Sequence, residues 1–491
     1  MGKRRIIGAV ALGTLIFGAA FVAFNWTNIK RLQTVNTLFD EDKIVENFSN
    51  MDGAFLHQQL DASPAPFIFP EDIQPLPETV TINGQTQNLE KLLADLDTTA
   101  LVILKDGKVI HESYSRGTAQ DDLRISWSVA KSFMSGLYGN AVKSGAIKSL
   151  DDKVEDYAPS LKGSAYEGAT IRNVLNMASG ITFNEDYMDP KSNINDMGRI
   201  LALGGSMDGY AAGLTAKDVP AGERWKYVSI DTHVGAMVLR AATGKTLHEL
   251  FNETYSAHLG FEQAPIYMTD GKNVAFALGG LNLSTRDYAK FGQMFLQNGE
   301  FNGTQVIPAE WVAASTVHSA PNMTGRDTGY GYQWWIPMPQ EGPNKGDYTA
   351  SGIYGQNIYV NPARGIVIAK NAADREFANP QDGYGHSMNV NLDMFRSISD
   401  QMGNEVEAPK ILDMSIITAR YGDSALAQGD FGEVFGIARS DENIDFEAII
   451  EEFKRTGRLP DGEALPDNEE LNAIWLQMLE EIKKQREAQG E

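Results

Sequence analysis

The stretch ISWSVAKSFMS, residues 125–135, places a serine and a lysine three residues apart at the start of a helical pattern. Apolar residues from Trp127 to Val142 recur at helical spacing, so Ser128 and Lys131 share one helix face. A lysine buried on such a face has a lowered pKa, and its neutral amine can take a proton from a serine hydroxyl. The alternative is a serine near an N-cap followed by a surface lysine.

Other nucleophile and cofactor motifs are missing from the chain. There is no Gly-x-Ser-x-Gly and no His-Glu-x-x-His, which disfavours an α/β-hydrolase and a zinc protease. Gly244-Lys245-Thr246 resembles the end of a phosphate loop, but the required earlier glycine is Leu239. No cysteine is present, which excludes a thiol nucleophile, disulfides and thiolate zinc sites. We therefore expect no metal and no cofactor.

The chain of 491 residues carries a net charge of −23. A nucleic-acid binder needs a basic face to neutralise phosphates, so we expect no nucleic-acid partner. Residues 401–491 hold 21 acidic and 9 basic residues and two amphipathic helical patterns. We interpret residues 403–491 as an acidic helical C-terminal extension, either a solvated appendage or a docking arm for a protein partner.

The N-terminus has the features of an exported protein. Lys3, Arg4 and Arg5 precede an apolar run at residues 6–24, long enough for a membrane-spanning helix. A cleaved signal peptide is the alternative. We expect residues 1–30 to anchor the protein in a membrane, with the catalytic domain on the periplasmic or other extracytoplasmic side. Residues 31–85, rich in proline, are expected to form a stalk or linker.

The central region has strand and helix patterns that do not alternate regularly. Residues 100–115 contain two β-rich runs joined by Asp106-Gly107, and residues 357–372 contain another such pair. Two hairpins with helical patterns between them predict an α+β fold built on an antiparallel sheet.

Five segments together resemble the serine β-lactamase and penicillin-binding superfamily. Within it, they are most similar to class C-related serine hydrolases, which include esterases, D-amino-acid peptidases and 6-aminohexanoate-oligomer hydrolases. The segments are ISWSVAKSFMS, Thr170–Ile181, Pro220–Arg240, Gly279–Glu300 and Tyr348–Ala363. Their order and spacing agree with the family from about residue 101 to 402. The resemblance implies a β-lactamase-like fold with a mostly helical lobe, which we assign to residues 86–402.

The resemblance also implies the catalytic residues. Ser128 matches the acylated nucleophile, Lys131 its lysine partner and Tyr227 the tyrosine that exchanges protons with the lysine. Backbone N–H groups of Ser128 and Ile353 match the oxyanion hole. Tyr359-Val360-Asn361 also fits the family's Tyr-x-Asn motif, but it follows the closing strand, so we interpret Tyr359 as a strand residue.

This sequence departs from the family pattern at two places. Ser229 replaces the asparagine of the second motif, as in aminohexanoate-oligomer hydrolases. The third motif reads Ala350-Ser351-Gly352 and lacks the cation that holds a carboxylate of β-lactams or cell-wall peptides. We therefore expect Ser229, Ser351 and Gly352 to bind substrate, while β-lactamase or peptidase activity is disfavoured.

Two tyrosines are further candidates for substrate contacts. Tyr187 lies in FNEDY, residues 183–187, which resembles the aminohexanoate-hydrolase subgroup, and Tyr354 follows the third motif. Either can instead be a core aromatic. Residues 192–215 are rich in glycine and methionine, and we interpret them as a mobile loop over the pocket.

The leading function is a serine hydrolase that cleaves a small amide or ester through an acyl-enzyme on Ser128. It would be of the 6-aminohexanoate-oligomer hydrolase or carboxylesterase type. The first alternative is a cell-wall D-amino-acid peptidase, β-lactamase or penicillin-recognising protein. The second is a membrane-tethered binding protein without catalysis.

Overall fold

The computed structural model describes residues 34–35, 37–323, 327–340, 342–377 and 386–406. The predicted membrane anchor at residues 1–30 lies outside the described residues, and so does the acidic C-terminal extension beyond residue 406. Within the described ranges, no helix has the length and apolar character needed to cross a bilayer.

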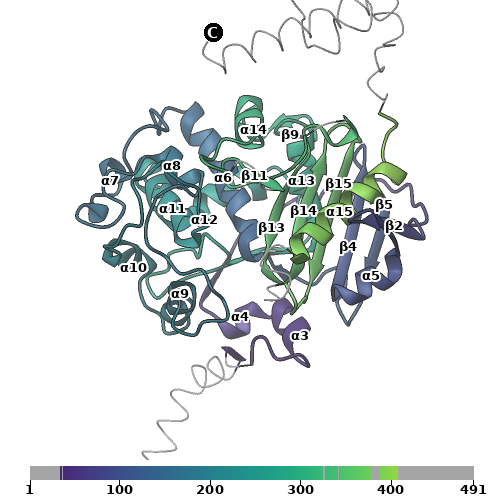
Figure 1. Ribbon diagram of the computed structural model, residues 1–491, viewed down its shortest axis with the longest axis horizontal. Coiled ribbons are helices and arrows are strands. Elements are labelled where there is room, and N and C mark those ends of the chain that lie inside the picture. Colours follow the sequence, from purple (N-terminus) through teal and green to yellow (C-terminus); the bar gives the residue numbers. More distant parts are fainter. Residues whose placement is uncertain (1–33, 36, 324–326, 341, 378–385, 407–491) are drawn as a thin grey trace, which may run out of the picture. The chain divides into compact units, whose positions relative to one another are not determined.

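A seven-stranded antiparallel sheet forms the centre of one half of the domain (Figure 1). Its strands, in spatial order, are β11 (Thr328–Tyr330), β12 (Trp335–Pro337), β13 (Tyr348–Gly352), β14 (Gln356–Asn361), β15 (Ile366–Ala372), β4 (Thr98–Lys105) and β5 (Lys108–Tyr114). The N-terminal hairpin therefore joins the sheet beside a strand that comes much later in the chain.

Both predicted hairpins are confirmed. In the β4–β5 hairpin Lys105 pairs with Lys108 across Asp106-Gly107, whose φ angles of 48° and 76° suit a two-residue turn. In the β14–β15 hairpin Asn361 pairs with Ile366.

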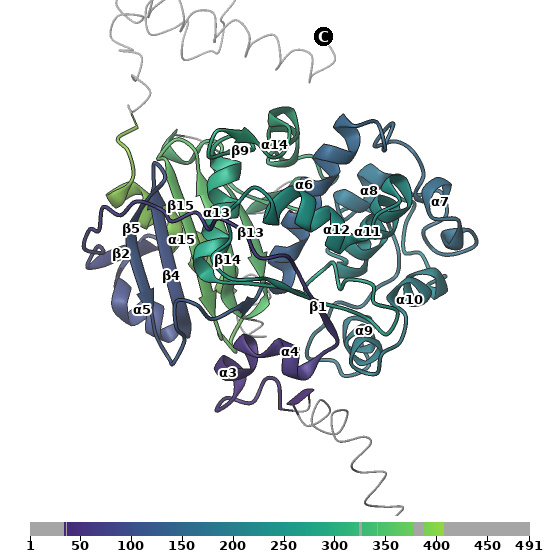
Figure 2. The same cartoon turned by 180° about the vertical axis from the view of Figure 1, so that it is seen from behind.

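Side chains alternate between the two faces of the sheet, and each face is covered by helices. On β4, Val102 and Leu104 pack into the cluster that contains α13 (Thr285–Leu296), whereas Leu101 and Ile103 pack into a second cluster. The second cluster includes α5 (Leu89–Asp95) and α15 (His386–Met402). Figures 1 and 2 show these helices on opposite faces. Gly292 of α13 allows the close approach, because a Cβ there would lie 2.5 Å from Val367.

The helical lobe lies beside the sheet, to the left in Figure 1. Its centre is α11, whose residues from Ser229 to Leu239 are all buried. The elements of the lobe are α6 (Ala130–Lys143), α7 (Val154–Tyr157), η2 (Pro159–Leu161), α8 (Ile171–Leu175), α9 (Asn193–Ala202), α10 (Met207–Gly213), α11 (Ser229–Thr243), α12 (Leu247–Phe251), η3 (Asn252–Ser256) and α14 (Ala309–Ser315).

Three smaller sheets complete the described part of the chain. The largest has four strands in the order β1-β7-β8-β6, and two are single hairpins. Their strands are β1 (His57–Gln59), β7 (Ile266–Met268), β8 (Leu281–Leu283), β6 (Arg124–Ile125), β2 (Thr79–Ile82), β3 (Gln85–Asn88), β9 (Glu300–Phe301) and β10 (Thr304–Gln305).

The structure differs from the expected stalk or linker at residues 31–85, because described residues of this segment pack on the domain. Phe48 of α3 (Ile44–Ser49) and Met51 of α4 (Met51–Ala54) are fully buried. The buried Arg124 of β6 donates hydrogen bonds to the Val45 carbonyl, at 2.7 Å, and to Ser49 Oγ, at 2.6 Å. Phe69, between Pro66 and Pro70, is buried as well.

The structure also differs from the mobile loop expected at residues 192–215. Helices α9 and α10 occupy most of this segment, and Ser192 and Ser206 cap them by accepting N–H groups of Asn195 and Gly209. Met197 and Met207 are fully buried, so the methionines serve as core residues.

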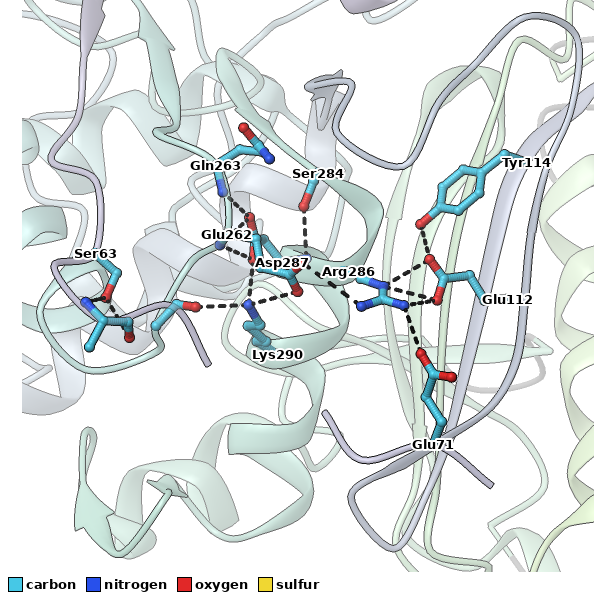
Figure 3. Close-up of polar contacts among 12 residues, drawn as sticks. Ser63, Glu71, Glu112, Tyr114, Glu262, Gln263, Ser284, Arg286, Asp287 and Lys290 are labelled. Carbon is cyan, nitrogen blue, oxygen red and sulfur yellow. Dashed lines mark hydrogen bonds and ion pairs between the residues drawn. The ribbon is translucent and has the colours of Figure 1, made fainter. Parts of the chain in front are cut away.

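A cluster of buried charges connects α13 to the neighbouring elements (Figure 3). Arg286 forms a bidentate ion pair with Glu112 of β5, with Nε 2.8 Å from Oε1. One turn along α13, Lys290 lies 2.9 Å from Asp287 and 3.2 Å from Glu262. We call these residues the α13 ion cluster.

Candidate active site

Ser128 lies in the turn η1 (Trp127–Val129), which leads directly into α6. The preceding residue, Trp127, has a positive φ of 42°, which is unusual for a bulky side chain. The Ser126 N–H donates to the Leu281 carbonyl at 2.8 Å and fixes the start of the turn on strand β8. The nucleophile therefore stands on a tightly bent segment and is largely buried, with 9% of the residue exposed.

The structure brings Lys131 to Ser128 as predicted. Lys131 Nζ lies 2.8 Å from Ser128 Oγ, 3.3 Å from Ser229 Oγ and 2.9 Å from the Leu278 carbonyl oxygen. The side chain is 1% exposed, and this burial lowers the pKa of Lys131 to about 7. A neutral amine is therefore accessible near pH 7, within hydrogen-bond distance of the serine.

Tyr227 joins the same site. Its ring centroid is 5.3 Å from Lys131 Nζ, and its ring stacks on Trp335 of β12 at 5.4 Å. Tyr227 and Ser128 line a small cavity of about 40 Å³ together with Ser351, Gly352 and Ile353. We call this the small cavity.

Strand β13 passes directly beside the nucleophile, which explains the glycine of the third motif. A Cβ on Gly352 would lie 2.7 Å from the Ser126 carbonyl oxygen and 3.0 Å from the Ser128 amide nitrogen. Only glycine allows this approach, which places Ile353 next to the serine turn. This arrangement is consistent with the predicted oxyanion hole of the Ser128 and Ile353 amides. Ala350, the first residue of the third motif, is buried.

A half-buried carboxylate that was not predicted completes the site. Glu185 accepts the Ser229 N–H at 2.9 Å and also the hydroxyl of Ser229. Burial raises the pKa of Glu185, while the nearby Lys131 opposes that shift. Ser229 thus connects the carboxylate to the lysine. FNEDY contains this glutamate, but its partner is 44 residues away and no local pattern indicates the pairing.

The two candidate tyrosines differ in position. Tyr187 donates to Glu185 at 2.9 Å and lines a second, larger cavity beside Ser128. Tyr354, with a positive φ of 60°, packs among aromatic rings, including Phe39 at 5.0 Å. Among the residues that line the two cavities at Ser128 in the described chain, Tyr187 is present and Tyr354 is not. Of the two tyrosines, Tyr187 therefore lies at a cavity beside Ser128, while Tyr354 is half-buried and packs against the core.

Tyr359 is a strand residue, as expected. It is fully buried on β14, and its hydroxyl donates to Asp347 at 2.8 Å. It packs in the cluster of α5 and α15, on the face of the sheet opposite α13.

Comparisons with known proteins agree with the resemblance found in the sequence. The Beta-lactamase family model matches residues 86–383. The 6-aminohexanoate-dimer hydrolase of Paenarthrobacter ureafaciens is 28% identical over 327 residues, which cover 63% of this chain and 81% of that protein. An uncharacterized protein of Alkalihalophilus pseudofirmus is 21% identical over 338 residues, covering 61% and 89%.

A solved structure shows the same fold. The structure described as "Putative 6-aminohexanoate-dimer hydrolase from Bacillus anthracis" has a TM-score of 0.66 and 24% identity, and the match covers 74% of this chain and 96% of that one. The chain belongs to the beta-lactamase family and has its α+β fold. Membership in this family, together with Ser128 and Lys131, supports a serine hydrolase.

Proposed function

We propose that the protein hydrolyses a small amide or ester through an acyl-enzyme on Ser128. The observation that carries this proposal is the 2.8 Å contact between Ser128 Oγ and the buried Lys131 Nζ. A lysine whose pKa is near 7 can act as a general base at neutral pH, which an exposed lysine cannot do.

In the first half of the reaction, Ser128 Oγ attacks the substrate carbonyl and its proton passes to Lys131. The amides of Ser128 and Ile353 stabilise the negative charge on the tetrahedral intermediate. Tyr227, beside Lys131 and in the small cavity, relays this proton from Lys131 to the leaving amine or alcohol. The carbonyl–leaving-group bond then breaks and the acyl group stays on the serine. In the second half, water attacks the ester and gives a proton to Lys131, the bond from the acyl carbon to Ser128 Oγ breaks, and the proton returns to Ser128 Oγ as the acid leaves.

Two observations favour small amides or esters of the 6-aminohexanoate-oligomer or carboxylesterase type. One relative carries the name 6-aminohexanoate-dimer hydrolase. The third motif offers Ala350 in place of the lysine that would hold a β-lactam carboxylate. A cell-wall peptidase or penicillin-recognising protein and a non-catalytic binding protein are the alternatives.

A labelling experiment separates these functions. The full-length chain and its Ser128→Ala variant are treated with a fluorophosphonate probe and with a fluorescent penicillin, and hydrolysis of p-nitrophenyl acetate is measured. We expect fluorophosphonate labelling and ester hydrolysis that both depend on Ser128. Penicillin labelling at Ser128 would instead favour the cell-wall alternative, and a folded protein that takes neither label would favour the binding protein.

A further inference from the structure

We infer that the larger cavity beside Ser128 binds the acyl part of the substrate, and that this acyl group is an uncharged, apolar chain of about six to ten carbons. The inference rests on the proposed acyl-enzyme function and narrows its substrate class: of the two types proposed, it favours the carboxylesterase type over the 6-aminohexanoate-oligomer type. We call this cavity the acyl chamber.

The size of the acyl chamber exceeds what a small acyl group needs. Its volume is about 450 Å³, and it reaches Ser128, Ser229 and Ile353. An apolar cavity of about 150 Å³ is enough to hold benzene, so the acyl chamber has space for a chain of about ten carbons. An acetyl group would leave most of it unfilled.

The walls of the acyl chamber are mainly apolar. Met197, Leu201 and Ala202 of α9 form one wall, and Phe276 and Leu278 form another. Trp127 lines the cavity with a buried indole N–H that has no hydrogen-bond partner among the described residues, and this donor carries no charge. Three other polar side chains of the lining already have partners. Arg199 pairs with Asp196, the Asn195 amide donates to two backbone carbonyls, and Tyr187 donates to Glu185.

Among the lining residues that the structure describes, Arg199 is the one with a charged side chain, and that side chain is half exposed. A charged group on the acyl chain would therefore enter apolar surroundings without a carboxylate in the lining to receive it. Transfer of a charge from water into such surroundings is strongly unfavourable. The acyl chamber thus selects against a terminal ammonium group.

The positions of the catalytic residues assign the acyl group to this cavity rather than the small one. Tyr227, the proposed proton donor, lines the small cavity and not the acyl chamber. The leaving group must therefore depart toward the small cavity. Ser128 and Ile353 line both cavities, as expected for the point where the two parts of a substrate meet.

A third wall comes from chain that precedes the family match at residue 86. Val35, Leu38, Phe39 and Phe55 line the acyl chamber. Phe39 also contacts Trp127, with ring centroids 6.1 Å apart, and is 42% exposed. The buried Arg124 holds α3 in place through Val45 and Ser49. The N-terminal segment therefore takes part in substrate selection.

The test measures kcat/KM of the full-length chain for p-nitrophenyl acetate, hexanoate, decanoate and 6-aminohexanoate. We expect kcat/KM to rise at least tenfold from acetate to hexanoate, because each buried methylene adds favourable transfer free energy. We also expect hexanoate to exceed 6-aminohexanoate at least tenfold. Equal kcat/KM values for hexanoate and 6-aminohexanoate, or a preference for acetate over hexanoate, would overturn the inference.

Two variants locate the effect in the acyl chamber. Ala202→Phe adds a ring to the α9 wall and should lower kcat/KM for decanoate about tenfold with little change for acetate. Ala212→Phe is the matched control, because Ala212 is also half-buried on a helix, α10, but does not line the acyl chamber. Equal losses in both variants would contradict the assignment.

Phe39→Ala tests the N-terminal wall and should reduce the preference for hexanoate over acetate at least threefold. An unchanged preference would remove this segment from the proposal. Fluorophosphonate labelling of each variant reports on the proposed function separately. If Ser128 takes no label, the acyl-enzyme mechanism itself fails, whereas labelling with a flat chain-length profile overturns only the inference.

Discussion

Lys131 and Lys290 are both buried and both donate to a backbone carbonyl, but their other partners differ. Lys131 contacts two hydroxyl groups, whereas Lys290 contacts the carboxylates of Asp287 and Glu262. Burial lowers the pKa of Lys131, whereas Lys290 is part of an ion pair, and a buried ion pair that loses one partner destabilises the fold strongly. The comparison teaches that burial alone does not define the role of a lysine: one outside an ion pair can serve as a base, and one inside an ion pair connects structural elements.

The largest expected effect comes from replacing each lysine by methionine. Lys131→Met should lower kcat/KM by about 10³, because the general base is lost, and should change the free energy of unfolding little. Lys290→Met should destabilise the fold by about 3–5 kcal/mol, because two buried carboxylates lose their partner. Ester hydrolysis and urea unfolding measure both quantities. If Lys131→Met were the more destabilising variant, the comparison would fail.

The next largest effect is the pH dependence of ester hydrolysis and of stability. Ester hydrolysis should fall as pH drops below about 7, because protonated Lys131 cannot accept the serine proton. The lowered pKa of Lys131 should also make the free energy of unfolding depend on pH. Between pH 7 and 10 the unfolded chain holds a proton on this lysine that the native chain lacks, so Lys131 makes stability rise with pH. This contribution is absent in Lys131→Met, and urea unfolding at several pH values would show the loss. An equally steep rise in that variant would contradict the assignment.

Replacing the carboxylates of Glu185 and Glu112 should have smaller effects on activity and stability. Glu185→Gln removes a negative charge near Lys131, so the pKa of Lys131 should fall and the acid limb of the pH–rate profile should move down by about one pH unit. Glu112→Gln, in the α13 ion cluster, should instead lower stability and leave the profile in place. Movement of the limb in both variants would show that the two regions are not independent.

The smallest effect is expected from two tyrosines that donate to these carboxylates. Tyr187→Phe should raise the pKa of Glu185 further and move the acid limb in the same direction as Glu185→Gln, but less. Tyr114→Phe removes a hydrogen bond to Glu112 and should cost about 1 kcal/mol of stability without altering the profile. Paired pH–rate and unfolding measurements check both, and a larger shift for Tyr187→Phe than for Glu185→Gln would be inconsistent with this order.

Local patterns in the sequence predicted the hairpins and made Ser128 a candidate nucleophile, which the family resemblance then assigned. Ser128 and Lys131 are one helical turn apart, and Asp106-Gly107 is a turn signal by itself. The family resemblance added Tyr227 and the place of Gly352, which no spacing could supply. The structure then gave the reason for the glycine, the approach of β13 to the Ser128 amide.

The features that the sequence did not reveal depend on contacts between distant residues. Glu185 meets Ser229 only because α11 begins where the FNEDY segment passes. The N-terminal wall depends on the contact of Arg124 with α3, across 79 residues. Helix α9 carried local signals, including a capping serine, but its glycine-rich surroundings led to the prediction of a loop. In the N-terminal segment and in α9, packing against distant parts of the chain therefore outweighs the composition that predicted a linker and a loop.

The position of β4 between β5 and β15 has a consequence for how the protein is made. The central pairing joins Lys105 to Ile366, so the ribosome must add about 260 residues after β4 before its partner exists. At ordinary rates of synthesis this takes roughly 15–50 s. During that time the β4–β5 hairpin exposes the apolar side chains of Val102 and Leu104 and an unpaired edge. The nascent chain therefore has a defined interval in which chaperones would protect it, and this interval ends when β15 emerges.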